Sequence, residues 1–340
     1  MTQRQYWFCI EPVDTLFFRG AEGMEAGEHH EVDTMFPPLP ETICGALRTA
    51  VMAQNQVVPA EFLDQPERYT HLPLLGTPER SGFTVTGPLF AVDGKMLFPA
   101  PAHWFTDKNV LKEAKDGATI QVETARPLDS GGIGLCGGAS KPFWVHRPIG
   151  RDLVPLSGYW VTADAIEAVG EEKFSLSLCR DLEEFIPDNP ILVEPGILFR
   201  REPRTGIALT SGRTAQKGHL YSSVHIRMAE GVSLVFAIDR NPVGCLASAG
   251  ILQLGGEQRV CRYRMVQGTS LPRGGSSGLR LALCPVPTEL IPADVPRAAG
   301  KISRVGGWDM KNRFHKPMQG YYPVGSVFAA DIDDQRLIAI

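Results

Sequence analysis

The sequence lacks any run of about 18 apolar residues, the length that a membrane-spanning helix needs. Its first residues, MTQRQYWFCIEPVD, also lack the long apolar core of a signal peptide. We therefore expect a soluble, cytoplasmic protein with no membrane partner. An excess of positive charge is missing too, because 34 lysines and arginines face 38 aspartates and glutamates. A uniformly basic surface is thus excluded, and any surface for nucleic acid must be local.

The seven cysteines form no C-x-x-C pair, and their number is odd. This spacing argues against a disulfide framework and against a zinc ribbon. The sequence also contains no H-E-x-x-H motif, no P-loop lysine pattern and no G-x-S-x-G elbow. The adjacent His29 and His30 lie in an acidic loop, where two neighbours cannot easily share one ion, so solvated histidines are favoured over a metal site. We expect no metal, no cofactor and no enzymatic activity.

The chain of 340 residues, 43% of them hydrophobic, is long enough for two domains. A proline-rich stretch near Pro187 and Pro190 suggests the boundary, which gives domains 1–186 and 187–340. Short apolar runs such as YWFCIEP and VCRYRMV predict strands, and the link AEGV predicts a hairpin between Leu220–Met228 and Ser233–Asp239. Strands that flank a few helices predict an α+β fold with antiparallel sheets backed by helices.

The clearest helix signal is the stretch FPPLPETICGALRTAV, in which Thr42 is the expected N-cap. Ile43, Leu47 and Val51 recur at helical spacing and predict the buried side. Gly45 costs helix stability, roughly 1 kcal/mol relative to alanine, so we expect a compensating close approach of another backbone there. With Arg48 one turn further on, this helix start is a candidate anion site. The alternative is a tightly packed helix with a solvated arginine.

Positive charge is concentrated in three segments of the second half. Residues 200–227 contain six basic residues and one acidic residue, and residues 301–316 contain five and one. Residues 258–280 contain five arginines and no acid, whereas the first 40 residues have two bases and seven acids. Glycines and aromatic residues (Tyr221, Tyr263, Trp308 and Phe314) are interspersed with these charges. This pattern indicates an anionic polymer as a partner, and solvated charged faces are the alternative.

Two histidines lie within these basic segments. His219 alternates with Lys217 and Tyr221 on one expected strand, which would suit acid–base chemistry on RNA, although ordinary sheet-face residues are favoured. His315 lies between Arg313 and Lys316, which suits contact with phosphate better than proton transfer.

Five stretches occur in an order that resembles a known family. They are EPVDTLFFRG, FPPLPETICGALRTAV, GIALTSGRTAQKGHLYSSVHIRM, LQLGGEQR and GGWDMKNRFHKPMQGYYPVGSVF, and together they span residues 11–328. The chain resembles the third subunit of the Cmr complex, the type III-B CRISPR effector, within the RAMP superfamily. The resemblance implies two ferredoxin-like (RRM-like) domains with long inserted loops, facing each other across a cleft. It also implies a non-catalytic subunit in antiviral defence that binds the 5′ handle of the CRISPR RNA (crRNA).

The same resemblance implies protein partners. These are the large polymerase-like subunit and a neighbouring backbone RAMP subunit, with target RNA as an indirect partner. The residues expected to contact RNA are Arg19, Gly45, Arg48, Lys217, His219, Tyr221, Arg262, Arg264, Gly306, Gly307, Trp308, Lys311, Arg313 and Lys316. The late glycine-rich stretch matches the RAMP glycine-rich loop only loosely.

Two other functions stay open. One is a metal-independent RAMP endoribonuclease that processes CRISPR RNA, with His29, His30 or His219 as proton carriers. The other is a pure scaffold, in which the basic segments contact acidic faces of other subunits.

Overall fold

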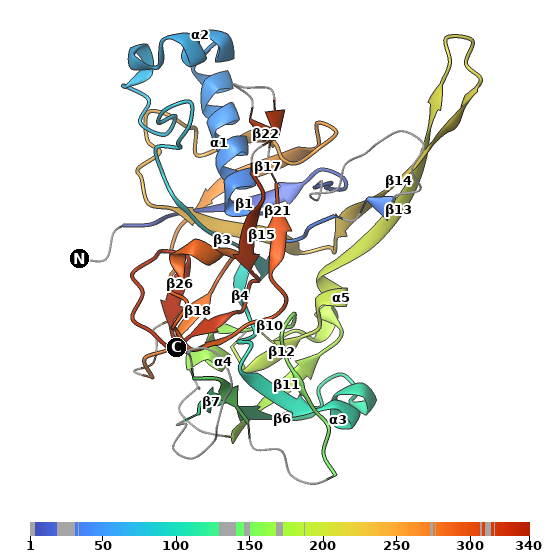
Figure 1. The fold of residues 1–340 in the computed structure, drawn as a ribbon, viewed down its shortest axis with the longest axis vertical. Coiled ribbons are helices and arrows are strands. Elements are labelled where there is room, and N and C mark those ends of the chain that lie inside the picture. The colour runs from blue at the N-terminus through green and yellow to red at the C-terminus, as the bar shows by residue number, and fades with distance from the viewer. Residues whose placement is uncertain are drawn as a thin grey trace. The chain divides into compact units, whose positions relative to one another are not determined.

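The computed structural model describes residues 4–18, 31–32, 34–128, 141–145, 150–167, 173–186, 188–272, 275, 277–306, 308–309, 314–315 and 317–340. The elements are mostly strands with a few short helices (Figure 1), which confirms the predicted α+β class. None of the described helices is long and apolar enough to cross a membrane.

The contacts divide the chain into two units of three segments each. Unit 1 comprises Met1–Pro88, Phe199–Gln267 and Arg304–Met318, and unit 2 comprises Leu89–Leu198, Gly268–Ser303 and Gln319–Ile340. Each unit therefore combines residues from both sides of the boundary predicted at 186–187. The passage from Leu198 to Phe199 lies near that boundary, and the domain division itself stays a prediction.

Unit 1 is built on an antiparallel sheet. Across the sheet its strands are β16 (Ala249–Gln253), β17 (Val260–Val266), β1 (Tyr6–Pro12), β15 (Val232–Ile238) and β3 (Val85–Val92), of which β3 continues into unit 2. The register sets Ile10 of β1 opposite Leu234 on one side and Tyr263 on the other. All seven residues of β15 are buried, as expected for a central strand covered on both faces.

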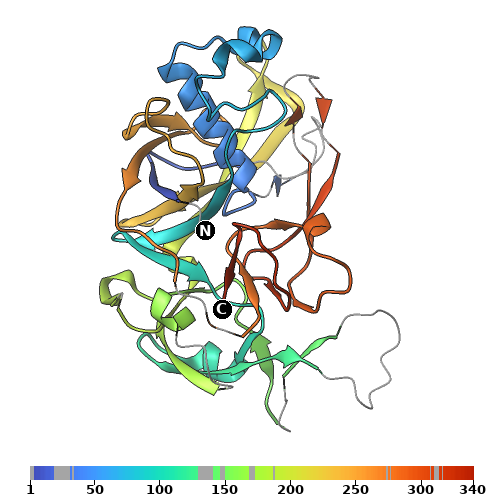
Figure 2. The ribbon, with the colours of Figure 1, turned by 90° about the vertical axis from the view of Figure 1, so that its left-hand side faces the viewer.

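Helix α1 (Pro40–Gln54) packs against this sheet, as Figures 1 and 2 show. Its buried side contains Ile43, Leu47 and Val51, which confirms the predicted stripe. The predicted N-cap is wrong: the helix begins at Pro40 after Leu39, whose backbone is extended. Proline is well suited to the first helical position because its missing N–H would have no partner there. The short α2 (Pro59–Asp64) and a 3₁₀ turn, η1 (Pro66–Tyr69), follow.

A long hairpin of β13 (Phe199–Leu209) and β14 (Ala215–Met228) extends from unit 1 (Figure 1). The edge of β14 pairs in parallel with β2 (Glu31–Val32). The hairpin predicted between residues 220–228 and 233–239 is wrong, because β14 pairs with β13 while β15 pairs with β1. The reason is that β15 is apolar on both faces and therefore takes a central position in the sheet. In the sequence of β14, by contrast, polar residues alternate with apolar ones.

The strand order continues in unit 2, where residues 90–92 of β3 pair with β4 (Lys95–Pro99). After β4 the strands, in order, are β10 (Trp160–Val161), β12 (Ile191–Val193), β11 (Lys173–Cys179), β6 (Thr119–Thr124), β5 (Trp104–Asp107) and β9 (Leu153–Pro155). Only the β11–β12 pair in this series is parallel. The accompanying helices are α3 (Lys108–Glu113), α4 (Ala163–Glu167), α5 (Pro195–Leu198) and the 3₁₀ turn η2 (Leu182–Glu184). Asp107 caps α3 by accepting hydrogen bonds from the backbone N–H groups of Asn109 and Val110.

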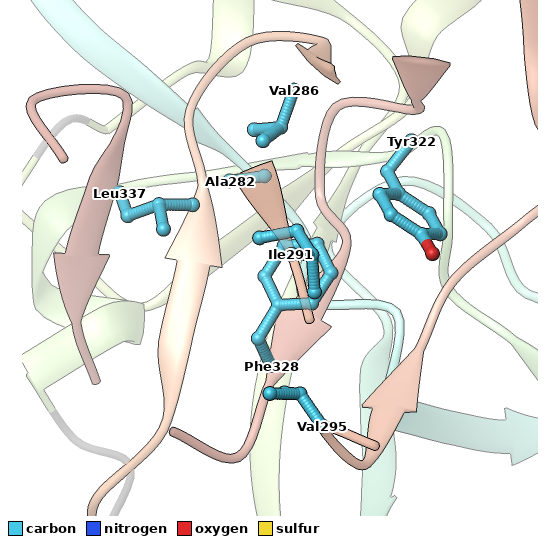
Figure 3. Close-up of a cluster of buried hydrophobic side chains, with 7 residues drawn as sticks. All are labelled: Ala282, Val286, Ile291, Val295, Tyr322, Phe328 and Leu337. Atoms are coloured by element: carbon cyan, nitrogen blue, oxygen red, sulfur yellow. The ribbon is translucent and has the colours of Figure 1, made fainter. Parts of the chain in front are cut away.

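Shorter strands complete the two units. They are β7 (Arg126–Pro127), β8 (Phe143–Trp144), β18 (Arg280–Ala282), β19 (Val286–Pro287), β20 (Arg297–Ala298), β21 (Ser303–Val305), β22 (Trp308–Asp309), β23 (Phe314–His315), β24 (Gln319–Tyr322), β25 (Val327–Phe328) and β26 (Leu337–Ala339), with a 3₁₀ turn η3 (Thr288–Leu290). Figure 3 shows the core of the C-terminal part of unit 2, where Ile291, Tyr322 and Phe328 pack together. The Tyr322 and Phe328 rings meet edge to face with centroids 5.3 Å apart.

Candidate functional site

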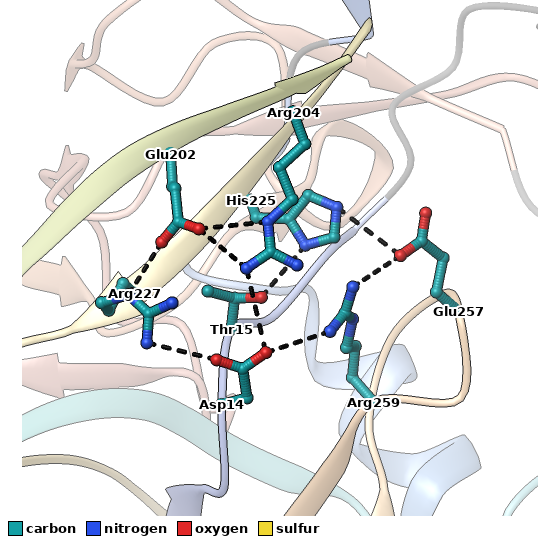
Figure 4. A network of polar contacts seen from close by, with 8 residues as sticks. All are labelled: Asp14, Thr15, Glu202, Arg204, His225, Arg227, Glu257 and Arg259. Carbon is teal, nitrogen blue, oxygen red and sulfur yellow. Dashed lines mark hydrogen bonds and ion pairs between the residues drawn. The ribbon is translucent and has the colours of Figure 1, made fainter. Parts of the chain in front are cut away.

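Three carboxylates and three arginines form a network at the base of the β13–β14 hairpin (Figure 4). Asp14, just after β1, lies at its centre. One carboxylate oxygen of Asp14 is 3.2 Å from Nη1 of Arg227, and the other is 3.3 Å from Nη1 of Arg259 and 3.8 Å from Nη2 of Arg204. Three chain segments that are distant in sequence are thereby connected.

Glu202 and Glu257 complete the network. Glu202 accepts hydrogen bonds from Arg204 at 2.8 Å and from Arg227 at 2.7 Å, and Glu257 accepts one from Arg259 at 2.7 Å. The hydrogen bonds from Arg227 and Arg204 lower the pKa of Glu202 to about 2. The six side chains therefore carry no net charge at neutral pH. This part of the basic segments is neutralised by Glu202, which the segment counts included, and by Asp14 and Glu257, which they did not.

His225 of β14 is buried inside this network, with 1% of its surface exposed. Its Nδ1 is 3.1 Å from the Thr15 hydroxyl, and its Nε2 is 3.6 Å from Oε2 of Glu257. Its ring stacks on the Phe17 ring, with the two centroids 5.1 Å apart. Burial lowers the pKa of His225, so the ring is neutral at pH 7. A neutral, enclosed imidazole holds the hairpin in place and is a poor proton carrier for an external substrate.

Beyond the network, the hairpin presents the predicted cationic and aromatic positions. Lys217, His219 and Tyr221 occupy alternate positions of β14, where the register with β13 shifts between Ile207 and Leu209. The structure describes the backbone of these three residues, and their side chains lie outside what it describes. At the tip, Arg213 is exposed with a left-handed backbone (φ 58°), and the hydroxyls of Thr210 and Thr214 are 2.7 Å apart.

Arg262 and Arg264 are exposed residues of β17 that alternate with buried Cys261 and Tyr263. Nη2 of Arg264 is 3.7 Å from Oε1 of Glu11 on β1. Tyr263 does not accompany the arginines at the surface as an interspersed aromatic. It points to the opposite, helix-covered face, where its hydroxyl accepts a hydrogen bond from Gln54 of α1 at 2.7 Å.

On α1, Gly45 is exposed, and a methyl group added there would meet no described atom within 4 Å. The close approach expected at this glycine is therefore not found among the described parts of the chain. Arg48 is half-buried: it donates a hydrogen bond to the carbonyl of Thr77, and its guanidinium lies 5.7 Å from the Phe62 ring centroid. Because α1 and the two arginines of β17 lie on opposite faces of one sheet, they do not form a single surface.

The last predicted stretch is described only in part. Gly306 is half-buried, and the backbones of Trp308 and His315 pair across β22 and β23. Arg19, Gly307, Lys311, Arg313 and Lys316 lie outside the described residues, as do His29 and His30. In the described part of the chain, no group of three histidine, cysteine, aspartate or glutamate side chains could hold a metal ion.

Sequence reasoning missed Asp14, Glu257 and His225 as organising residues. Asp14 lies in the stretch EPVDTLFFRG and Glu257 in LQLGGEQR, so both belong to stretches that carried the resemblance. Only the fold shows that these stretches meet at the hairpin base.

The molecule is thus an α+β protein of two strand-rich units, with a charged hairpin anchored in the first. The chain belongs to the CRISPR-associated Cas_Cmr3 family, because the model of that family matches residues 8–274. This finding confirms the family predicted from the sequence. No curated protein sequence matches the chain.

Two solved structures share the fold. Both are chains of cryo-EM structures described as the type III-B Cmr-beta bound to cognate target RNA, one of them also with AMPPnP. Each gives a TM-score of 0.52 and covers 95% of this chain, with sequence identities of 18% and 19%. The matched regions amount to 85% and 86% of those chains. At this identity the likeness concerns the fold.

Proposed function

We propose that this protein is a non-catalytic RNA-binding and scaffolding subunit of a type III-B CRISPR effector complex in antiviral defence. It would hold the 5′ handle of the crRNA and dock the large polymerase-like subunit, beside a backbone RAMP subunit. Membership of the Cas_Cmr3 family supports this proposal, and so does the presence of target RNA in the solved structures that share the fold.

The observation that carries the proposal is the anchored hairpin. At its base the charges cancel, while Arg213, Lys217 and Tyr221 occupy positions of its outer part, beyond that network along the hairpin. A single-stranded RNA needs cations for its phosphates and planar side chains for its bases. A two-stranded arm with both, held rigidly at one end, is suited to follow such a strand.

The strand order of unit 1 supports a ferredoxin-like domain. In chain order the main elements are β1, α1, β3, β15 and β17, with residues 89–198 of unit 2 and then the long hairpin inserted between β3 and β15. Across the sheet the fourth of these strands lies next to the first, then come the third and the second, which is the ferredoxin-like arrangement. A turn at Pro242–Leu246 stands where the second helix would be. The second such domain and the cleft remain part of the proposal through the family resemblance.

The proposed test is cross-linking of the full chain to 5′-handle RNA that carries a photoreactive nucleotide. We expect adducts within β14. The double variant Lys217→Ala/Tyr221→Ala should bind the handle about tenfold more weakly, because stacking on an aromatic ring is worth about 1–3 kcal/mol per base. Its plot of log affinity against log salt should be shallower by about 0.7, the value for one lost phosphate contact on a single strand.

Lys112→Ala is the matched control, since Lys112 is an exposed lysine of α3 outside the basic segments. It should change neither the affinity nor the salt slope. Absence of adducts in residues 199–340, together with a flat salt response, would favour the pure scaffold instead. The predicted contacts at Arg19, Arg48, Gly306, Gly307, Lys311, Arg313 and Lys316 remain part of the proposal, and the same adduct map tests them.

A further inference from the structure

Beside β16, β17 and the end of β1, the face of the unit 1 sheet that is turned away from α1 carries solvent-exposed hydrophobic residues. Val13 donates its backbone N–H to the carbonyl of Val260, which places these two valines side by side at the start of β17. The register sets Ile251 of the edge strand β16 directly opposite Arg262, so Ile251 lies diagonally across from Val260. Exposed fractions are 58% for Val13, 66% for Ile251 and 38% for Val260.

Charged residues lie among these side chains. The register places Arg262 between Glu11 on β1 and Ile251 on β16, and Arg264 is the next outward residue of β17. Oε1 of Glu11 is 3.7 Å from Nη2 of Arg264, and within the described ranges no ion pair involves Arg262. We call these six residues (Glu11, Val13, Ile251, Val260, Arg262 and Arg264) the outer face.

Single exposed hydrophobic residues are common, whereas a contiguous group bordered by charges marks an interaction surface. The solvent side of an antiparallel sheet is normally polar. Here three neighbouring outward positions are β-branched and apolar, and two arginines outnumber one glutamate. This composition resembles that of a protein interface, in which an apolar centre and arginine are enriched.

The outer face offers no platform for nucleobases. Single-stranded RNA is held by bases that stack on aromatic side chains, and the only aromatic residue of β17, Tyr263, is buried on the other face against Gln54. Aliphatic side chains next to an unpaired arginine suit a protein surface with aliphatic residues and carboxylates.

We infer that the outer face docks a neighbouring protein subunit through an aliphatic patch bordered by carboxylates. The inference rests on the proposed role as a scaffolding subunit and assigns Arg262 and Arg264 to protein contact instead of RNA contact. The hairpin would then serve the RNA while the sheet face serves the assembly.

The test compares Ile251→Glu and Ile251→Lys in the full chain. A glutamate would repel the carboxylates of the partner, whereas a lysine would not, so association with the other purified subunits of the type III-B complex should fall more than tenfold for Ile251→Glu and clearly less for Ile251→Lys. Val243→Glu is the matched control, because Val243 is 74% exposed on a loop of the same unit, outside the outer face. Handle-RNA affinity and the urea midpoint should stay unchanged in all three.

Three results would overturn the inference. If Ile251→Glu associated with the other subunits as strongly as the wild type does, the outer face would not be a subunit contact. A loss of handle-RNA affinity with intact association would make it an RNA surface. A dimer of the isolated wild-type chain that Ile251→Glu disrupts would make the occupant a second copy. If the wild-type chain bound neither handle RNA nor any subunit, the proposed function itself would fail.

Discussion

At the residue scale, Glu202 shows how a single carboxylate alters the meaning of a basic segment. Six basic residues lie between residues 200 and 227, yet two of them, Arg204 and Arg227, donate to Glu202 and also face Asp14. A count along the sequence includes Glu202 but not Asp14, which is almost 190 residues earlier. Charge counts predicted where the cations lie and could not predict which of them are neutralised.

Replacing Glu202 with glutamine should destabilise the hairpin base in a pH-dependent way. The pKa of Glu202 is lowered from 4.5 to about 2, so its charge stabilises the folded state fully above pH 4.5. That stabilisation is lost as the pH falls from 4.5 towards 2. The difference in urea midpoint between the wild type and Glu202→Gln should therefore be largest near pH 7 and shrink below pH 4.5.

Glu67→Gln is the control, because Glu67 is an exposed carboxylate of unit 1 outside the network. Its urea midpoint should follow the wild type at every pH. If the difference in urea midpoint between Glu202→Gln and the wild type stayed constant from pH 7 to pH 3, this would contradict the assigned role of the carboxylate.

At the element scale, periodicity predicted the elements better than their partners. The buried stripe of α1 and the strand β17 were visible because apolar residues recur at the period of each element. The start of α1 was misplaced since Thr42 is a typical cap, while the fold uses Pro40 at the first position. The pairing of β14 was also misjudged, because a short link favours a hairpin and the sequence does not reveal that β15 is needed at the sheet centre.

The turn between β16 and β17 offers a prediction at this scale. Gly255 has a left-handed backbone (φ 86°), and a methyl group placed on it would lie 2.4 Å from the carbonyl oxygen of Phe17. That carbonyl already accepts the N–H of Gly256 at 2.7 Å. Gly255→Ala must therefore displace this turn, which carries Glu257 and Arg259 of the hairpin network.

Gly244 provides the comparison, because its backbone is also left-handed (φ 84°) and a methyl group there would meet nothing within 4 Å among the described residues. Both alanine variants carry the strain of a positive φ, and only Gly255→Ala adds the clash. We expect Gly255→Ala to lower the free energy of unfolding by about 1–3 kcal/mol more than Gly244→Ala does. If urea denaturation showed that both variants lose the same free energy of unfolding, this would contradict the close contact between Gly255 and Phe17.

At the scale of the whole molecule, residues that are distant in the sequence become neighbours in the fold. Each unit takes three separate segments of the chain, and the domain boundary placed at 186–187 from the sequence stays a prediction. The resemblance nevertheless identified the family, because its stretches include residues that the fold brings together, such as Asp14 and Glu257. The sequence analysis did not identify the outer face, since exposed and buried aliphatic residues look alike in a sequence.

The endoribonuclease alternative also belongs to this scale. A metal-independent nuclease needs an accessible imidazole that can exchange protons near neutral pH. His225 is 1% exposed and His103 is 2% exposed, and burial lowers the pKa of His103 to about 3. Neither can act on an external RNA, so among the candidates named from the sequence the question depends on His219, His29 and His30.

We expect the full chain, incubated with repeat RNA and EDTA at pH 7, to yield no cleavage product. His219→Ala and the double variant His29→Ala/His30→Ala should be indistinguishable from the wild type in this assay. An alkaline hydrolysis ladder of the same RNA shows that a product would be detected. A product that the wild type forms and one of these variants does not would establish the nuclease. The hairpin would then present a substrate to a catalytic histidine instead of only holding a guide.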